Sequence, residues 1–253
     1  MASNVKNQQQ NNKQYKLTSD ISFELEQAKL QTDEKLTYLN LSNHNIGSSI
    51  KLLSEVLKNS ETVTYLNLHN SNIDDEGAKI VAKFLQDNNI VTKIDISNNN
   101  ISYEGIKHLV KELNINNTLD EINLAHNDIG DQGADILAEF LANNGTLKRI
   151  HLNDNNIGAK GAFQLCKALE FNRTLTEITL GYAFFYHHEA EELVKSLQNK
   201  KIVSKIMISF FGHENHDINY DYINSNYNYS KLSELLIEDL RDNYRETDGI
   251  NIN

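Results

Sequence analysis

The sequence lacks proline and tryptophan altogether and contains a single cysteine, Cys166. One cysteine cannot form a disulfide bond within the chain, which agrees with a reducing compartment. The lack of proline and tryptophan beside abundant asparagine, lysine and isoleucine indicates an AT-rich coding sequence. Stability must therefore come from a packed core, and the 39% of hydrophobic residues is enough for one.

Positive charge and long apolar runs are also scarce. Lysine and arginine number 24 against 35 aspartate and glutamate residues, for a formal net charge of -11. Nucleic-acid binding needs clustered positive charge, so nucleic acid is not an expected partner. No stretch approaches the roughly 20 apolar residues that span a bilayer, and the opening MASNVKNQQQNNKQYK lacks the apolar core of a signal peptide. We expect a cytoplasmic protein without membrane insertion.

One phrase recurs along the chain. Its clear copies are LTYLNLSNHNIG from Leu36, VTYLNLHNSNID from Val63, VTKIDISNNNIS from Val91, LDEINLAHNDIG from Leu119 and LKRIHLNDNNIG from Leu147. Degenerate copies begin at Leu175 and Val203. The starts are evenly spaced from Val63 onward, and only the first copy is shorter, by a single residue. A fixed period of this length indicates stacked supersecondary units.

Each copy predicts a strand, a turn and a helix. Apolar residues at the first, fourth and sixth places, as in Leu119, Ile122 and Leu124, give the alternation of a strand with one buried face. The second half, from Ala134 and Leu137 in the same copy, changes to helical spacing. Because a crossover helix lets successive strands pair in parallel, we predict an α/β solenoid of about seven repeats, a horseshoe with a parallel sheet on the concave side and helices on the convex side. The strands are predicted near residues 38–42, 65–69, 93–97, 121–125, 149–153, 177–181 and 205–209.

These residues carry a family resemblance. The pattern LxxLxLxxNxIG is followed by a glycine four residues after the isoleucine, as in Ile129 and Gly133, then by LxxxL and an NxTL close. It resembles the ribonuclease-inhibitor type of leucine-rich repeat, which is shared with the sensor regions of NOD-like receptors and with Ran GTPase-activating protein. The resemblance covers residues 36–212 and implies a leucine-rich repeat domain there. It does not specify a partner.

The asparagine at the ninth place of the repeat has a structural explanation. Its amide can bond to backbone groups in the turn where the strand ends, which would otherwise be buried without partners. Asn99, Asn127 and Asn155 hold this place in the central copies. Other residues replace it in the first two and the last two copies. We therefore predict a structural asparagine ladder that is best formed in the middle of the domain.

The N-terminal end differs from the repeats. Residues 1–16 are polar and rich in glutamine and asparagine, so they are expected to form a disordered tail. Residues 17–35 predict a helix that caps the first repeat, because Ile21, Leu25 and Ala28 share one helical face.

The C-terminal end also lacks the repeat. Residues 213–229 predict a linker, and residues 230–253 a short amphipathic helix and a tail. The apolar face of that helix consists of Leu232, Leu235, Leu236 and Leu240. The helix either caps the domain, which we favour, or docks on a partner.

Stacking makes equivalent concave positions neighbours at about 4.8 Å. The third-place column alternates in charge after two tyrosines: Tyr38, Tyr65, Lys93, Glu121, Arg149, Glu177 and Lys205. We favour a self-neutralising ladder over a charged stripe that a partner recognises. The eighth-place column ends in aromatic residues, which either pack inward or form a contact patch. The candidate partner-binding residues on the concave face are Tyr38, Tyr65, Lys93, Asp95, Glu121, His126, Arg149, His151, Asp154, Glu177 and Tyr182.

Candidate chemistry is sparse. The sequence contains no GxxxxGKS or GxxxxGKT, no GxSxG and no HExxH. His126 beside Asp154 and His151 resembles an acid/base cluster, but no nucleophile with an oxyanion site accompanies it. Four histidines of the last two turns lack the cysteines or carboxylates of a metal site: His187, His188, His213 and His216. We predict no enzyme activity, no catalytic residue, no cofactor and no metal site.

The predicted function is protein binding. A rigid concave sheet presents side chains over a long span, so it can hold a folded protein partner, of unknown identity, by many contacts. The chain is expected to be monomeric on its own. Proteins of this repeat class in intracellular bacteria are often delivered into host cells as effectors, and the small size, polar tails and lack of a Sec signal agree with that. The alternative, by resemblance to Ran GTPase-activating protein, is a regulator that activates a small GTPase.

Overall fold

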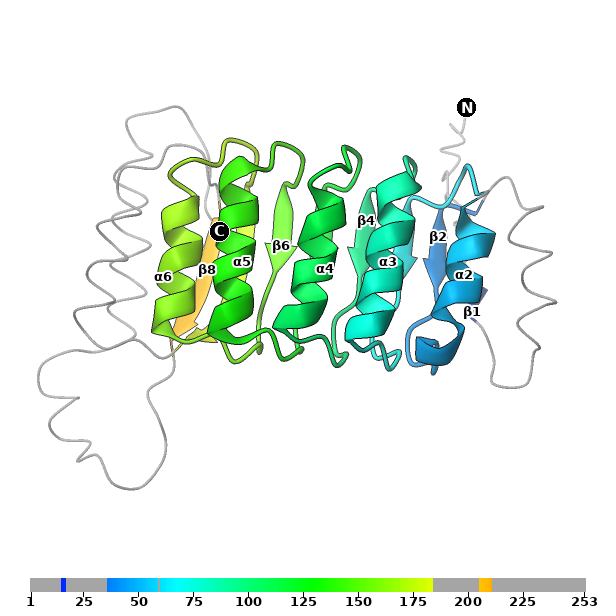
Figure 1. Cartoon of the computed structure of the whole chain (residues 1–253), viewed down its shortest axis with the longest axis horizontal. Coiled ribbons are helices and arrows are strands. Elements are labelled where there is room, and N and C mark those ends of the chain that lie inside the picture. The colour runs from blue at the N-terminus through cyan, green and yellow to red at the C-terminus, as the bar shows by residue number, and fades with distance from the viewer. Residues whose placement is uncertain (1–14, 17–35, 59, 184–204, 211–253) are drawn as a thin grey trace, which may run out of the picture.

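The chain folds into a row of strand–helix units. The computed structural model describes residues 15–16, 36–58, 60–183 and 205–210 (Figure 1). Eight parallel strands form one open sheet and pair in chain order: β1 (Tyr15–Lys16), β2 (Tyr38–Asn40), β3 (Tyr65–Asn67), β4 (Lys93–Asp95), β5 (Glu121–Asn123), β6 (Arg149–His151), β7 (Glu177–Ala183) and β8 (Lys205–Phe210). This arrangement confirms the predicted parallel sheet.

Helices connect the strands on one side of the sheet. Among the described residues these are the 3-10 helix η1 (Gly47–Ser49) and the α-helices α2 (Ile50–Leu57), α3 (Asp75–Asp87), α4 (Tyr103–Leu113), α5 (Gly130–Asn143) and α6 (Ala159–Ala168). In Figure 1 the helices stand side by side in front of the strands, which confirms the α/β solenoid. We call their side the helix face. The opposite side of the sheet, predicted to be concave, is the sheet face.

The register of the sheet follows the repeat. Tyr38 pairs with Tyr65, Tyr65 with Lys93, and the third-place pairing continues strand by strand to Lys205. The predicted strand starts are therefore confirmed. Strands β2 to β6 have three residues each rather than the five predicted. They end early because the chain turns: the fifth-place Asn67 accepts a hydrogen bond from the N–H of His69 at 2.9 Å, and three other repeats repeat this contact.

A strand that the sequence pattern does not predict precedes the first repeat. Tyr15 pairs with Leu39 and Lys16 with Asn40, although both lie in the segment 1–16 predicted to be a disordered tail. The open edge of β2 explains the pairing, because unpaired N–H and C=O groups of an edge strand attract a further segment. The remainder of that tail, the predicted cap helix at 17–35, and the predicted linker and helix beyond residue 212 lie outside the described residues.

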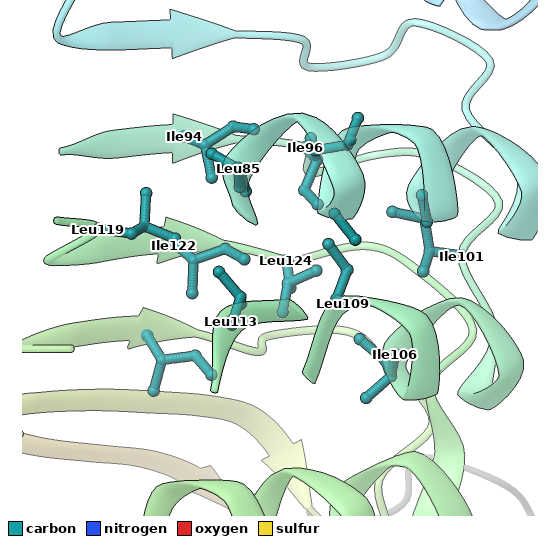
Figure 2. Close-up of a cluster of buried hydrophobic side chains, with 14 of the residues drawn as sticks. Leu85, Ile94, Ile96, Ile101, Ile106, Leu109, Leu113, Leu119, Ile122 and Leu124 are labelled. Atoms are coloured by element: carbon teal, nitrogen blue, oxygen red, sulfur yellow. The ribbon is translucent and has the colours of Figure 1, made fainter. Parts of the chain in front are cut away.

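The core lies between the sheet and the helices. Figure 2 shows Ile94 of β4 and Ile122 of β5 on the same side of the sheet as Leu85 of α3 and Leu109 and Leu113 of α4. These five side chains are at most 5% exposed. Fully burying one such side chain contributes about 1.5–3 kcal/mol. Because every repeat supplies equivalent residues, stability is spread along the row and each repeat depends on its neighbours.

The ninth-place asparagines form a ladder through the turns after the strands. Asn127 Nδ2 donates to the carbonyl oxygens of Ile96 at 3.1 Å and Leu124 at 2.9 Å, which belong to adjacent repeats. Its Oδ1 accepts a hydrogen bond from the N–H of Ile101 at 3.0 Å. One amide thus supplies partners for buried backbone groups on both sides of a repeat boundary.

The ladder continues on both sides of Asn127. Asn99 and Asn155 donate to the equivalent carbonyl oxygens at 2.8–3.0 Å. Ser71 stands at this place in the second repeat, and its hydroxyl donates to the carbonyl oxygen of Leu41 at 3.0 Å. The Ser71 hydroxyl therefore keeps one of these hydrogen bonds in the second repeat, where the sequence pattern predicts that the ladder is interrupted.

A second ladder lies at the opposite end of the strands. Its members are Asn88, Asn116, Asn144 and Asn172. The Oδ1 atom of each accepts hydrogen bonds from two N–H groups of the loop that enters the next strand. Asn116 Nδ2 also donates to the carbonyl oxygens of Leu85 at 2.6 Å and Asn88 at 3.1 Å in the preceding repeat. This role of the asparagine is not evident from the NxTL motif alone. The recurrence of asparagine at the same place of successive repeats is the signal that predicts it.

Two helices are capped from the preceding repeat. Asp75, in the first turn of α3, accepts hydrogen bonds from the N–H groups of Ser102 at 2.8 Å and Gly105 at 2.9 Å, at the start of α4. Asp131 of α5 caps α6 in the same way. The recurring glycine of the motif is explained by the isoleucine four residues before it, because a Cβ at the glycine would lie 2.3–3.0 Å from the isoleucine Cγ2 in each of the four central repeats. The capping aspartate adds a second close contact, 2.5 Å from Asp75 Oδ1 at Gly105 and 2.6 Å from Asp131 Oδ1 at Gly161.

The other helices start differently. Helix α3 is capped by its own Asp74. Helix α5 has no side-chain cap and begins at Gly130, whose φ of +61° favours glycine. The Gly130 N–H donates to the Asn155 carbonyl oxygen at 2.9 Å. Tyr103 of α4 occupies the place of the capping aspartate. The boundaries α3–α4 and α5–α6 are therefore capped across the repeat, and the boundary α4–α5 is not.

The last two strands depart from the repeat. Strand β7 has seven residues and β8 has six, and their register shifts between Thr179 and Gly181. Ala183 holds the ninth place here, so no amide closes a turn and the strand runs on. The degeneracy of the last copies thus corresponds to longer strands.

Candidate functional site

The third- and fifth-place side chains of the strands share the sheet face. Side chains alternate along a strand, so these residues flank the buried fourth-place residue that faces the core. Strand pairing places the predicted third-place candidates in one column: Tyr38, Tyr65, Lys93, Glu121, Arg149 and Glu177. All except Glu121 are partly exposed, and Glu121 is 8% exposed. The column is therefore a continuous row that a partner could contact.

Glu121 is the centre of the charged part of this column. Its Oε1 lies 2.5 Å from Lys93 Nζ, and its Oε2 lies 2.6 Å from Arg149 Nε. Burial by itself would raise the pKa of Glu121. The hydrogen bonds from Lys93 and Arg149 outweigh that effect, so the pKa lies below its ordinary value. The bond to Glu121 in turn raises the pKa of Arg149. Lys93, Glu121 and Arg149 therefore pair along the column, and the three side chains together carry one net positive charge.

Two tyrosines stack at the N-terminal end of the sheet face. The ring centroids of Tyr38 and Tyr65 lie 4.5 Å apart, with 23° between the ring planes. Lys93 Nζ lies 4.7 Å from the centroid of the Tyr65 ring, so this ammonium group contacts both the tyrosine and Glu121. Desolvation by burial, with a contribution from the nearby Asp95 carboxylate, raises the pKa of Tyr65 to about 12. Tyr65 therefore stays a neutral hydrogen-bonding group at physiological pH.

The fifth-place residues form a polar network beside this column. Asp95 Oδ1 accepts hydrogen bonds from Ser97 Oγ at 2.5 Å and from the Ser97 N–H at 2.9 Å, and Asp95 Oδ2 accepts one from Asn123 Nδ2 at 3.0 Å. His69 Nδ1 lies 2.9 Å from Ser97 Oγ. These are the residue types of a hydrolytic triad, but the serine donates to the carboxylate rather than to the histidine. The group orders the turn and does not activate a nucleophile.

The eighth-place column is selected by backbone conformation. Its described members Asn43, Asn70, Asn98, His126 and Asp154 all have φ between 50° and 62°. Asparagine, aspartate and histidine enter this left-handed region more readily than other non-glycine residues. The residue types in this column therefore follow from the turn and are not by themselves evidence for a partner site.

The three residues that resemble an acid/base cluster in the sequence lie in two separate places. His126 Nε2 lies 3.3 Å from Asp154 Oδ2 at the exposed end of the strands. His151 instead lies within the sheet face, where Nδ1 is 3.3 Å from Thr179 Oγ1 and Nε2 is 3.9 Å from Glu121 Oε1. No acid/base triad of these three residues exists. The backbone of Tyr182, the remaining candidate, pairs with β8, and its side chain is outside the described part.

Other kinds of site find little support in the part of the chain that the structure describes. No group of three or more histidine, cysteine, aspartate or glutamate residues there could hold a metal ion. His187, His188, His213 and His216 lie outside that part. Across the same described ranges, no helix has the length and apolar character that crossing a bilayer requires.

Comparisons with known proteins agree with this geometry. A family model described as Leucine Rich repeat matches residues 32–50, 59–82, 87–110, 116–138 and 143–166. A search of curated proteins finds no match.

Solved structures resemble the fold at low identity. A structure of leiomodin-1 actin-binding site 2 is 16% identical with a TM-score of 0.39, and the match covers 88% of this chain and 94% of that one. The tropomodulin C-terminal domain of Caenorhabditis elegans is 15% identical with a TM-score of 0.49, covering 68% and 94%. The leucine-rich repeat-containing protein LegL7 from Legionella pneumophila is 14% identical with a TM-score of 0.33, covering 94% and 99%.

Proposed function

We propose that this chain, which is a leucine-rich repeat protein, binds a folded protein partner through its sheet face. The single observation that carries the proposal is the ordered surface across β2 to β7. There, aromatic, amide and charged side chains lie in register at about 4.8 Å per strand.

The side chains of this surface are already held in place. Tyr65 is fixed by Tyr38 on one side and Lys93 on the other, and Arg149 is fixed by Glu121. Ordering a free, flexible side chain at an interface costs about 0.5–1.5 kcal/mol. A partner that contacts this surface avoids much of that cost, so preorganisation favours binding.

The surface also holds the residue types that contribute most to protein interfaces. Tyrosine and arginine are enriched among the interface residues whose truncation costs about 2 kcal/mol or more. Tyr65 on β3 and Arg149 on β6 are three strands apart, which corresponds to about 14 Å at the usual strand spacing. A folded domain can cover both at once, because a standard interface buries roughly 800 Å² on each partner.

The test compares capture by the full chain with capture by a sheet-face variant, Tyr65→Ala with His151→Ala. Cytosolic extract supplies the partner, and its affinity is then measured with purified proteins. We expect the variant to bind at least about tenfold more weakly, the effect of losing about 1.4 kcal/mol. Both side chains are partly exposed and neither belongs to the core. Thermal unfolding should therefore change little.

A matched variant on the helix face is Lys79→Ala with Lys107→Ala. Both lysines are exposed, and among the described residues each pairs only with a glutamate of its own helix, at 3.0 Å and 3.4 Å. Its affinity should equal that of the unchanged chain. Lost binding in this variant, with full binding by the sheet-face variant, would move the site to the helices and refute the proposal. The ribonuclease-inhibitor subclass, the cytoplasmic location, the lack of catalysis and the effector role stay predictions from the sequence.

A further inference from the structure

A groove of about 530 Å³ opens on the helix face over α2, α3 and α4. Ile80 and the buried Phe84 of α3 contribute its apolar lining. Five lysines surround them: Lys51, Lys58, Lys79, Lys83 and Lys111. Four acidic residues also line the groove: Glu55, Glu76, Asp87 and Glu112. The proposed sheet-face site does not use any of these residues, so the groove is a separate feature.

The groove has a cationic side. Two of its four acids are paired with groove lysines, Glu76 with Lys79 at 3.0 Å and Glu112 with Lys111 at 3.5 Å. Lys51 of α2 and Lys58, which directly follows α2, are exposed, and neither forms an ion pair within the described ranges. The chain as a whole has a net charge of -11. With five lysines against four acidic residues, the groove lining carries one net positive charge, whereas the chain as a whole is acidic.

The short first repeat accounts for the groove. This repeat is shorter than the later ones by a single residue, and α2 has eight residues where α3 has 13. Helix α2 also starts from a 3-10 turn without a side-chain cap. A shorter helix covers less of the flank of α3 and leaves Ile80 and Phe84 beneath an opening. Figure 1 shows α2 at the N-terminal end of the helix row, next to α3.

We infer that this groove binds an acidic amphipathic helix, and that its occupant is the segment 231–246 of the same chain. The sequence of that segment places apolar residues at helical spacing: Leu232, Leu235, Leu236 and Leu240. The segment has three basic residues and five acidic ones, and the acidic residues are Glu234, Glu238, Asp239, Asp242 and Glu246. An apolar stripe flanked by carboxylates complements an apolar floor flanked by lysines.

The length of the intervening chain favours a distant site over a local cap. Residues 211–230 separate the segment from β8, and about 20 extended residues span at most about 70 Å. Strand β8 lies five strands beyond β3, which precedes α3, so the groove is about 40–50 Å away at 8–10 Å per repeat on the helix face. The segment can therefore reach the groove. A helix that only covered the last repeat would need a connection of about 2–8 residues.

The test measures distances in the full chain with pairs of nitroxide labels. One pair joins the groove to the segment, through Ser54→Cys and Ser233→Cys. A reference pair joins α6 to the segment, through Gln164→Cys and Ser233→Cys. Cys166 is buried at 0% exposure and does not take up label in the folded chain. We expect one short, narrow distance distribution for the groove pair and a long distance for the reference pair.

Charge reversal tests the recognition itself. Lys51→Glu with Lys58→Glu should lengthen and broaden the groove distance, and adding Glu234→Lys with Glu238→Lys should restore it. Reversal of two helix-face lysines outside the groove, Lys107→Glu with Lys160→Glu, should leave the distance unchanged. Labelling Glu55→Cys in place of Ser54→Cys gives an independent groove distance if the first position disturbs α2.

Four results overturn the inference. A short distance to Gln164→Cys would show that the segment covers the last repeats instead. Broad distributions for both pairs would show that it does not dock. A short groove distance that appears only on raising the protein concentration would assign the contact to a second copy. A groove distance insensitive to reversal of Lys51 and Lys58 would remove the charge complementarity on which the choice of occupant depends.

Discussion

The boundary between α3 and α4 and the boundary between α4 and α5 are built from the same repeat but held by different contacts. At the first, Asp75 caps the start of α4, and Asn99 Oδ1 accepts the N–H groups of Ser71 and Ile73. At the second, Tyr103 replaces the capping aspartate. There Asn127 still closes the turn, because its Oδ1 accepts the N–H of Ile101. The first boundary has both polar contacts, and the second has the asparagine contact without the aspartate cap.

The sheet face shows the opposite distribution. Lys93 of β4 and Glu121 of β5 form a 2.5 Å ion pair between the repeats that contain α4 and α5. The preceding boundary, between β3 and β4, has only the contact of Lys93 with the Tyr65 ring in this column. The comparison teaches that repeats with one consensus sequence do not share one set of stabilising contacts. Each boundary has to be read from its own residues.

The largest effect is expected for Asn127→Ala. This change removes the partners of the Ile96 and Leu124 carbonyl oxygens and of the Ile101 N–H, all in a buried turn. The free energy of unfolding, measured by chemical denaturation, should fall by about 1–3 kcal/mol. The same change at Asn155 should cost less, because its Oδ1 has no partner to lose within the described residues. Equal losses at the two positions would show that the Oδ1 contact of Asn127, at the α4–α5 boundary, adds nothing beyond what Asn155 supplies at the α5–α6 boundary.

Asp75→Ala should have the next largest effect. Three donors lose their acceptor, namely the Ser102 N–H, the Ser102 hydroxyl and the Gly105 N–H. Loss of an N-terminal cap costs about 0.5–2 kcal/mol, and we expect a fall in the upper half of that range. Tyr103→Ala, at the equivalent place of the uncapped boundary, is the control and should cost less. Hydrogen exchange should locate the loss at the start of α4.

The sequence predicts most of the fold, because the buried residues of a solenoid repeat with the period of the chain. The strand starts and the asparagines of the first ladder follow from that period. The capping aspartates do not, because Asp75 and Asp131 recur only in alternate repeats and act on the next repeat. A consensus sequence averaged over all repeats does not show a feature that occurs only in alternate repeats. Comparing repeats two apart would reveal it.

The candidate site is harder to predict than the fold. The third-place column is correct in register, because strand pairing fixes which residues are neighbours. The cluster of His126, Asp154 and His151 does not form as one unit, because the turn carries His126 and Asp154 past the strand end while His151 stays in the sheet. Side-chain direction at a positive-φ residue cannot be read from the strand alternation. That geometry appears only once the turn is known.

A smaller effect is expected for Glu121→Gln, and it depends on pH. The folded-state pKa of Glu121 lies below its ordinary value, so the carboxylate contributes stability above about pH 4.3, the usual pKa of an unfolded glutamate. That contribution is lost as the pH falls through the folded-state pKa. At pH 7 we expect the variant to be less stable by about 1 kcal/mol or less. The difference should shrink below pH 4 in denaturation experiments, and a constant difference down to pH 3 would refute the pKa direction.

The smallest effect is expected on the helix face. Lys79→Ala with Lys107→Ala removes two exposed ion pairs within single helices, with Glu76 and Glu104. Such pairs contribute about 0.2–0.5 kcal/mol each. Neither pair crosses a repeat boundary, so stability should fall by well under the loss at Asp75. A larger fall would show that boundary contacts do not dominate.

The second asparagine ladder has a consequence for how the protein can be produced. Asn116, Asn144 and Asn172 each stand two residues before a threonine, in the N-x-T pattern that secretory pathways use for N-glycosylation. Glycan attachment consumes the Nδ2 group, and Nδ2 of Asn116 and Asn172 donates to carbonyl oxygens inside the solenoid. A sugar chain added during synthesis would have no room in these loops and would separate adjacent repeats. Expression through a secretory route should therefore yield misfolded glycoforms, and replacing the threonines by residues other than serine should remove that hazard while keeping the ladder.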